Sequence, residues 1–281
     1  MRNRLFCGLL LAMFAAVPLH AGEWSKTYKV AGHPSLRFDT DDGAISLVSS
    51  NAPEIQVNIV AQGWDIGREI QITESQAGNS VDIRMQVPEF QWRLFSLSRR
   101  SIRVEIRVPR ESDLDLHTGD GSVKIDYVTG RIKVDTGDGQ ISAQDLKGEI
   151  RMHTGDGRID GAGFDGSLNA DTGDGQIRVH GRFDALQLRT GDGSIEAAAE
   201  AGSAVAQDWS ISTGDGNIHL SIPPNANAEL RAHTGDGRVR IDLPFTVSGT
   251  QSRTVIRGKI GAGGGIVSLE TGDGSITVQP L

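Results

Sequence analysis

The chain contains one cysteine, Cys7, among 281 residues, and few aromatic residues, at 5%. A single cysteine cannot form an internal disulfide. If Cys7 is removed with a leader peptide, the remaining chain has no thiol for catalysis and no thiolate for a metal site. This chain therefore has few aromatic side chains on which sugar rings could stack. The tryptophans available for such a role are Trp24, Trp64, Trp92 and Trp209.

A long apolar run occurs at residues 5–19, after Arg2 and Arg4 and before small residues that end at Ala21. This pattern is typical of a secretory signal peptide cleaved after Ala21. The run is too short for a comfortable membrane span, and no second run of that length follows. We therefore predict a signal peptide at residues 1–21 and a single domain without a transmembrane segment at residues 22–281, exported to the periplasm or the cell surface.

Positive charge is also scarce. The formal net charge is −8, and loss of Arg2 and Arg4 with the leader would leave 26 basic against 36 acidic residues, a balance of −10. Such acidity argues against nucleic acid as a partner, because phosphate backbones require clustered Lys and Arg.

The tetrapeptide Thr-Gly-Asp-Gly, abbreviated TGDG, is the dominant feature of the chain. It occurs eight times, and the first five copies are 18 residues apart. Apolar and polar residues alternate before each copy, and a β-branched residue stands two positions after it, so each unit contains two short strands. We predict an all-β, single-stranded parallel β-helix (β-solenoid) with coils of about 18 residues, right-handed because parallel crossovers are. The copies begin at Thr118, Thr136, Thr154, Thr172, Thr190, Thr213, Thr234 and Thr271.

Degenerate units extend the repeat toward the N-terminus. Residues 36–47, LRFDTDDGAISL, match the unit except that Asp41 replaces the first glycine, which predicts a terminal coil. Residues 44–114 alternate without the tetrapeptide and predict two to four further parallel coils. The domain would then have degenerate coils at 30–110 and regular coils at 111–281, with a flexible corner or covering loop at residues 258–265, GKIGAGGG.

Each residue of the tetrapeptide has a structural role in this interpretation. The first glycines, such as Gly119, Gly137 and Gly155, should have positive φ or make the closest corner contacts. The threonine should donate and accept hydrogen bonds along the stack, and backbone N–H groups should cap the aspartate carboxylates. The alternative is a calcium-dependent repeat protein, but a single carboxylate per coil supplies few of the six to eight oxygens that calcium requires. We predict no cofactor and no bound metal; the candidate ligands would be Asp120, Asp138, Asp156, Asp174 and Asp192.

Two further groups of residues are candidate sites. Residues before successive threonines alternate in charge, so His117, Asp135 and His153 form either a transition-metal site or a surface charge ladder. We favour the ladder, because positions along a flat column rarely converge on one ion. The second group lies in a basic segment and forms either a contact loop for an anionic glycan or lipid headgroup, or a solvated loop; its members are Trp92, Phe95, Arg99 and Arg100.

Three segments together resemble the bacterial putative-adhesin family, an exported β-helix domain of unknown function: LRFDTDDGAISL at residues 36–47, SIRVEIRVPRESDLDLHTGDGSVKI at residues 101–125 and GKIGAGGGIVSLETGDGSITV at residues 258–278. The resemblance covers nearly the whole chain after the leader and implies a non-enzymatic solenoid without catalytic residues. We therefore expect a structural or binding module of the cell envelope, adhesin-like or related to envelope stress, whose partner is an envelope protein or a glycan. The alternative is a carbohydrate-active β-helix enzyme, which would need paired carboxylates beside aromatic platforms.

Overall fold

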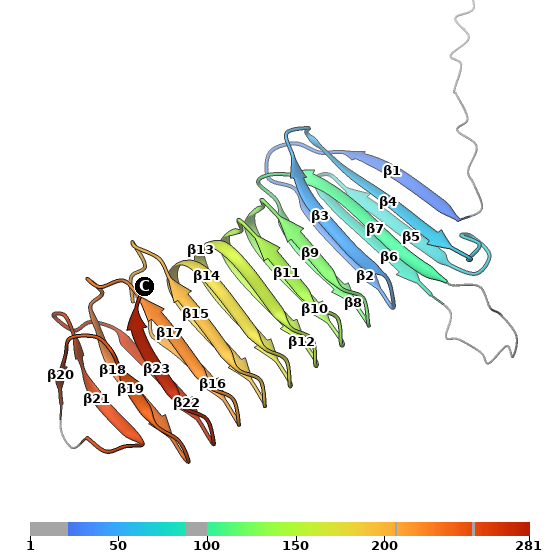
Figure 1. The fold of residues 1–281 in the computed structure, drawn as a ribbon. Helices are drawn as coiled ribbons and strands as arrows, with labels where there is room; N and C mark the ends of the chain where they lie inside the picture. The colour runs from blue at the N-terminus through green and yellow to red at the C-terminus, as the bar shows by residue number, and fades with distance from the viewer. Residues whose placement is uncertain (1–21, 88–99, 206, 249–250) are drawn as a thin grey trace, which may run out of the picture.

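The computed structural model describes residues 22–87, 100–205, 207–248 and 251–281. These residues form 23 strands in a stack of flattened coils, and none of them lies in a helix (Figure 1). The predicted all-β, solenoid-like architecture is therefore confirmed. A search of the same residues for a helix long and apolar enough to cross a membrane finds none.

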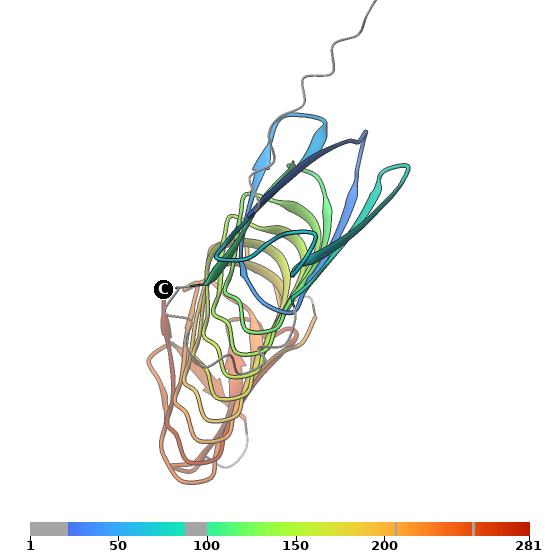
Figure 2. The ribbon, with the colours of Figure 1, turned by 90° about the vertical axis from the view of Figure 1, so that its right-hand side faces the viewer.

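Two facing sheets make up the stack, and the view along it in Figure 2 shows how narrow the space between them is. We call the sheet whose strands lead into the TGDG turns the pre-turn sheet. In spatial order it contains β5 (Gln71–Ala77), β6 (Ser80–Gln86), β2 (Ser35–Thr40), β8 (Asp113–Thr118), β10 (Thr129–Thr136), β12 (Lys147–Thr154), β13 (Ile159–Thr172), β14 (Ile177–Thr190), β16 (Trp209–Thr213), β22 (Ile266–Thr271), β18 (Ala228–Thr234), β21 (Val255–Ile260) and β20 (Phe245–Val247).

The strands that follow the turns form the post-turn sheet. The long strands β13 and β14 belong to both sheets, because each begins after one turn and ends at the next. In spatial order the post-turn sheet contains β1 (Glu23–Lys29), β4 (Glu54–Gln62), β7 (Ser101–Pro109), β3 (Ala44–Ser50), β9 (Val123–Asp126), β11 (Ile141–Gln144), β13, β14, β15 (Ile195–Ala199), β17 (Ile218–Ile222), β23 (Ile276–Pro280) and β19 (Val239–Ile241).

The first repeat unit is not at the end of the stack, contrary to the sequence-based expectation. Strand β2 lies between β6 and β8, and strand β3 lies between β7 and β9. The segment at 44–114 is not a series of parallel coils either, because β4 pairs antiparallel with both β1 and β7, and β5 pairs antiparallel with β6. Alternation of apolar residues is the same in parallel and antiparallel strands, so the pattern could not distinguish them.

The C-terminal end has a comparable rearrangement. The last repeat, β22 and β23, lies between the coil of β16 and β17 and the coil of β18 and β19, as Figure 1 shows. Strand β21 then pairs antiparallel with β18, and β20 pairs antiparallel with β21. The predicted flexible corner at 258–265 is therefore wrong for its first part, because Gly258 and Lys259 lie within β21.

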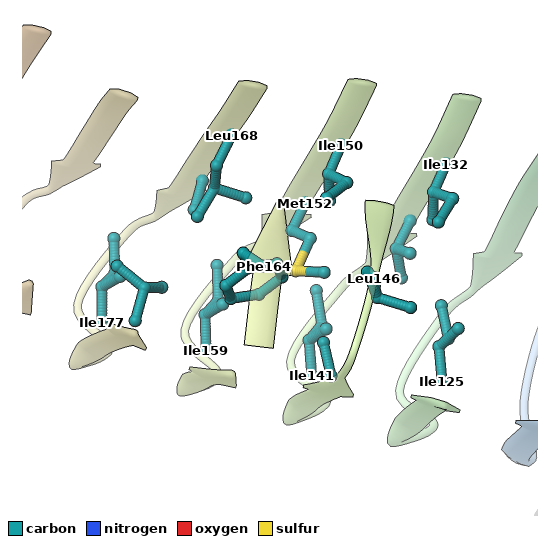
Figure 3. Close-up of a cluster of buried hydrophobic side chains, with 14 of the residues drawn as sticks. Ile125, Ile132, Ile141, Leu146, Ile150, Met152, Ile159, Phe164, Leu168 and Ile177 are labelled. Carbon is teal, nitrogen blue, oxygen red and sulfur yellow. The ribbon is translucent and has the colours of Figure 1, made fainter. Parts of the chain in front are cut away.

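The core consists of columns of apolar side chains that repeat from coil to coil. Ile132, Ile150 and Leu168 of the pre-turn sheet face Ile141 and Ile159 of the post-turn sheet, and all are buried (Figure 3). The β-branched residue two positions after each tetrapeptide is buried in every coil, as predicted. These residues are Val123, Ile141, Ile159, Ile177, Ile195, Ile218, Val239 and Ile276.

Candidate binding surface

The TGDG turns are held together by a ladder of buried threonines. The hydroxyl of Thr154 donates to the carbonyl oxygen of Gly139 in the preceding coil at 2.9 Å and accepts from the N–H of Gly157 in its own turn at 3.2 Å. The predicted donating and accepting role of threonine is thus confirmed. A fully buried hydroxyl needs such partners, because an unpaired one would lose its hydration without compensation.

The glycines are required for close stacking rather than for positive φ. None of the tetrapeptide glycines has a positive φ, so that half of the expectation is wrong. A Cβ atom at Gly139 would lie 2.0 Å from the carbonyl oxygen of Gly121, and one at Gly157 would lie 2.1 Å from that of Gly139. Positive φ occurs instead at the opposite corner, where Gly148 has a φ of 116°.

The aspartates of the repeat lie on the solvent side of the turns. Within the described residues, no backbone N–H group donates to the carboxylates of the five aspartates proposed as ligands, so the predicted caps are absent. A search of those residues for three or more His, Cys, Asp and Glu side chains that could hold a metal ion finds no such group. All five side chains are exposed, and water can therefore screen their mutual repulsion: Asp120, Asp138, Asp156, Asp174 and Asp192.

The residue before each threonine faces outward and forms the predicted charge ladder. His117 Nδ1 is 3.5 Å from Asp135 Oδ1, and His153 Nδ1 is 2.9 Å from Asp171 Oδ1. Each histidine pairs with one carboxylate, so His117, Asp135 and His153 do not surround a common point. The rearranged first unit continues the alternation, because Asp39 lies between Arg84 and His117.

The pairing in this ladder ends at Asp171. The following positions in space are Arg189, Ser212, Glu270 and His233, in that order. In the part of the chain that the structure describes, none of these side chains has an ion-pair partner within 4.0 Å. Their charges and hydrogen-bonding groups are thus available to a ligand.

A hollow of about 950 Å³ lies over this part of the pre-turn sheet. A second hollow of about 590 Å³ lies on the same strands, β13 and β14, nearer the corner opposite the turns, and its lining includes Asn169 and Gln187. We call the two together the pre-turn groove. Its polar lining residues include His153, Asp171, Arg189, Ser210, Ser212, His233, Glu270, Glu149, Arg151, Ser167, Asn169, Gln187 and Gln207.

A column of uncharged polar side chains crosses the pre-turn sheet here, and all of its members except Ser268 line the groove. Asn169, Gln187, Ser210 and Ser268 occupy equivalent positions on neighbouring strands. No hydrogen bond from these four side chains to another described residue is present. The earlier coils have charged residues at the corresponding positions, and two of these, Lys133 and Asp115, pair with each other at 3.5 Å.

One wall of the groove is fixed by an ionic cluster at the corner opposite the turns. Arg182 bridges Asp165 and Asp184, with Nη1 2.6 Å from Asp184 Oδ1, and Lys147 Nζ is 3.1 Å from Asp165 Oδ2. Hydrogen bonds from Arg182 and Lys147 lower the pKa of the Asp165 carboxyl, and Arg182 lowers that of Asp184. These carboxylates therefore stay ionised and hold the wall in place.

A smaller hollow of about 440 Å³ lies on the outer face of the post-turn sheet, between Lys124 and Glu196. Its charged residues are largely paired with one another. Lys124 contacts Asp126 at 3.3 Å, and Arg178 lies 3.4 Å from Asp160 and 3.8 Å from Glu196. It therefore offers fewer free groups than the pre-turn groove.

The remaining candidates from the sequence are placed as follows. Trp92, Phe95 and Arg99 lie outside the described residues, so the contact loop stays a prediction. Arg100 packs over the ring of Trp64 at 4.2 Å and lies 3.7 Å from Glu69.

The tryptophans give little support to a carbohydrate platform. Trp209 is buried, with 2% exposure, and packs edge-on against Phe183, so it belongs to the core. Trp24 and Trp64 are partly buried against the core. The pre-turn groove was missed from the sequence, because Ser212 and Glu270, which both line it, become neighbours only through the out-of-order last coil.

Comparison with solved structures finds similar chains of low identity. A putative cell adhesion protein from Clostridium sporogenes ATCC 15579 is 14% identical, with a TM-score of 0.30, and the alignment covers 92% of this chain and 99% of that chain. A putative lipid binding protein from Parabacteroides distasonis ATCC 8503 is 14% identical, with a TM-score of 0.48 and coverage of 92% and 96%. A putative adhesin from Parabacteroides merdae ATCC 43184 is 11% identical, with a TM-score of 0.40 and coverage of 92% and 96%.

No curated protein matches the chain. A family model described as Toastrack DUF4097 matches residues 33–279, nearly all of the folded part. This match confirms the resemblance identified from the repeat. The chain belongs to the Toastrack DUF4097 family.

Proposed function

We propose that this protein is an exported, non-catalytic binding module of the cell envelope that contacts its ligand through the pre-turn groove. The observation that carries this proposal is the change along the outer face of the pre-turn sheet. In the charge ladder the side chains are paired with one another up to Asp171, whereas Arg189, Glu270 and His233 beyond it have no ion-pair partner among the described residues. A hollow lined by polar groups that have no partner within the protein is a candidate binding site.

Export is supported by the composition of residues 1–21, and placement in the envelope by the adhesin-like names of the structural neighbours. A coil of 18 residues is supported by the registers that place Thr136 opposite Thr118 and Thr154. The right-handed winding follows the general preference of parallel crossovers.

A binding role is favoured over hydrolysis because the groove is built from repeated positions of successive coils. Purified protein should release no reducing ends from common glycans. Turnover that disappears on mutation of one groove carboxylate, such as Glu270→Gln, would contradict the non-catalytic role.

The binding role can be tested with purified full-length chain and isolated envelopes of the source bacterium. We expect the envelopes to retain at least fivefold less of a groove variant, Arg189→Ala with Ser212→Ala, than of the unchanged protein. The matched control is Lys124→Ala with Ser142→Ala on the post-turn face, which should be retained normally. Equal retention of the two variants would contradict binding through the groove.

A further inference from the structure

We infer that the ligand of the pre-turn groove is an uncharged polysaccharide strand that lies along the stack and crosses successive coils. This inference rests on the proposed binding function and specifies the chemistry of its ligand. Three features of the groove support it: its uncharged polar column, the mixed charges beside that column and the lack of exposed large apolar side chains among its described residues.

The uncharged column matches the chemistry of a polyhydroxylated chain. Asn169 and Gln187 each provide amide donors and a carbonyl acceptor, and Ser210 can donate and accept through its hydroxyl. Sugar hydroxyls also do both, so each rung can form hydrogen bonds in either direction. Neighbouring strands lie about 4.8 Å apart, so the same groups recur regularly along the groove.

The charges beside this column are of both signs and alternate. Arg189 is followed in space by Ser212, Glu270 and His233. A polyanion would be repelled by Glu270 and Asp171, and a polycation by Arg189, so neither fits the whole groove. Neutral hydroxyls can bond to both the guanidinium and the carboxylate, and charge-assisted hydrogen bonds of this kind are the stronger ones.

The surface chemistry disfavours a protein or lipid ligand. The centres of protein interfaces are enriched in aromatic residues and Met, and lipid chains need apolar contact. The exposed large hydrophobic residues of the described chain lie elsewhere: Val48, Tyr127, Val247 and Leu281. An uncharged polysaccharide is therefore the class that the groove fits best.

The test uses calorimetry with the full-length protein and three uncharged hexasaccharides: cellohexaose, maltohexaose and chitohexaose. We expect at least one to bind, and glucose or N-acetylglucosamine alone to bind at least tenfold more weakly, because a strand contacts several coils. Asn169→Ala with Gln187→Ala should weaken binding at least fivefold. The matched control, Ser142→Ala with Gln144→Ala on the post-turn face, should leave it unchanged. Both targeted pairs are accessible to solvent, and a thermal melt verifies folding.

Several outcomes would overturn this inference. One is the absence of binding by all three hexasaccharides, and another is binding that the Asn169 and Gln187 substitutions do not change. Competition by dextran sulfate at equal strength would show a polyanion site instead. If envelopes still retain the protein in a way that depends on Arg189 and Ser212 but the hexasaccharides do not bind, the ligand class is wrong and the binding function stands. If the groove substitutions do not change the retention of the protein by envelopes, the binding function itself is wrong.

Discussion

Thr271 donates its hydroxyl hydrogen bond to the carbonyl oxygen of Gly216 at 2.7 Å, although 55 residues separate them in the sequence. Thr234 belongs to the next repeat after Gly216, yet it bonds to Gly274 of the last repeat at 2.6 Å. The last coil is therefore inserted into the stack and completes the contacts of two coils that precede it in sequence.

Removal of residues 266–281 should consequently destabilise the C-terminal end far more than loss of a terminal coil would. The deletion removes Val267, Leu269, Ile276 and Val278 from the core and leaves β16 and β18 without their shared partner. Each buried aliphatic side chain contributes about 1.5–3 kcal/mol, so we expect the melting temperature to fall by more than about 10 °C. Circular dichroism and size-exclusion chromatography will measure this, with deletion of Leu281 alone as the control. A melt within a few degrees of the intact chain would show that the insertion is dispensable.

The buried threonine ladder should tolerate serine much better than valine. Thr154→Val keeps the shape of the side chain but leaves the carbonyl of Gly139 and the N–H of Gly157 without this partner. We expect a loss of about 1–3 kcal/mol in the free energy of unfolding, measured by urea denaturation. Thr154→Ser retains the hydroxyl and should cost less. Equal losses for both variants would mean that the methyl group, and not the hydrogen bond, stabilises the turn.

The second glycine of a tetrapeptide should accept no side chain. In Gly139→Ala the new Cβ would lie 2.0 Å from the carbonyl oxygen of Gly121, and backbone must move to relieve this contact. We expect a cost of about 3 kcal/mol or more. Gln140→Ala, at the adjacent exposed position, should change stability by less than about 0.5 kcal/mol. A small effect of Gly139→Ala in the same urea titration would refute close stacking as the reason for the glycine.

Stability should fall in acid because several carboxylates have lowered pKa values in the folded chain. Hydrogen bonds from Arg182 lower the pKa values of Asp165 and Asp184. Burial alone would raise the pKa of Glu74, but hydrogen bonds from Lys26 and Tyr28 lower it. A group with a lowered folded pKa stabilises the protein above its unfolded pKa, about 4, and that contribution is lost as the pH falls through the folded value.

Unfolding free energies measured between pH 6 and pH 2 should therefore decrease most steeply below about pH 4. Asp165→Asn should make this decrease shallower, because one carboxylate that stabilises the fold is gone. Asn169→Ala, a nearby change without a titrating group, should leave the slope as it is. A slope that does not respond to Asp165→Asn would show that this cluster does not contribute to the acid dependence.

The sequence by itself determined the repeating unit. Alternating residues such as Ile150 and Met152 and the β-branched Ile159 fixed which side chains point inward, because a strand has a period of two. The tetrapeptide determined where the turns lie and where the threonine ladder forms. Every coil needs the same buried threonine hydroxyl and the same glycines without side chains at its turn.

Only the tertiary structure decided which coils are neighbours and what the surface offers. Every unit presents the same inward columns, so any coil can stack on any other, and the pattern could not place the coil of Thr271 beside that of Thr213. The same ambiguity concealed the antiparallel strands at both ends, the burial of Trp209 and the column that joins Gln187, Ser210 and Ser268. Local periodicity specifies a coil, whereas the order of coils depends on contacts between segments far apart in the chain. One end of the candidate binding groove lies where that order differs from the sequence.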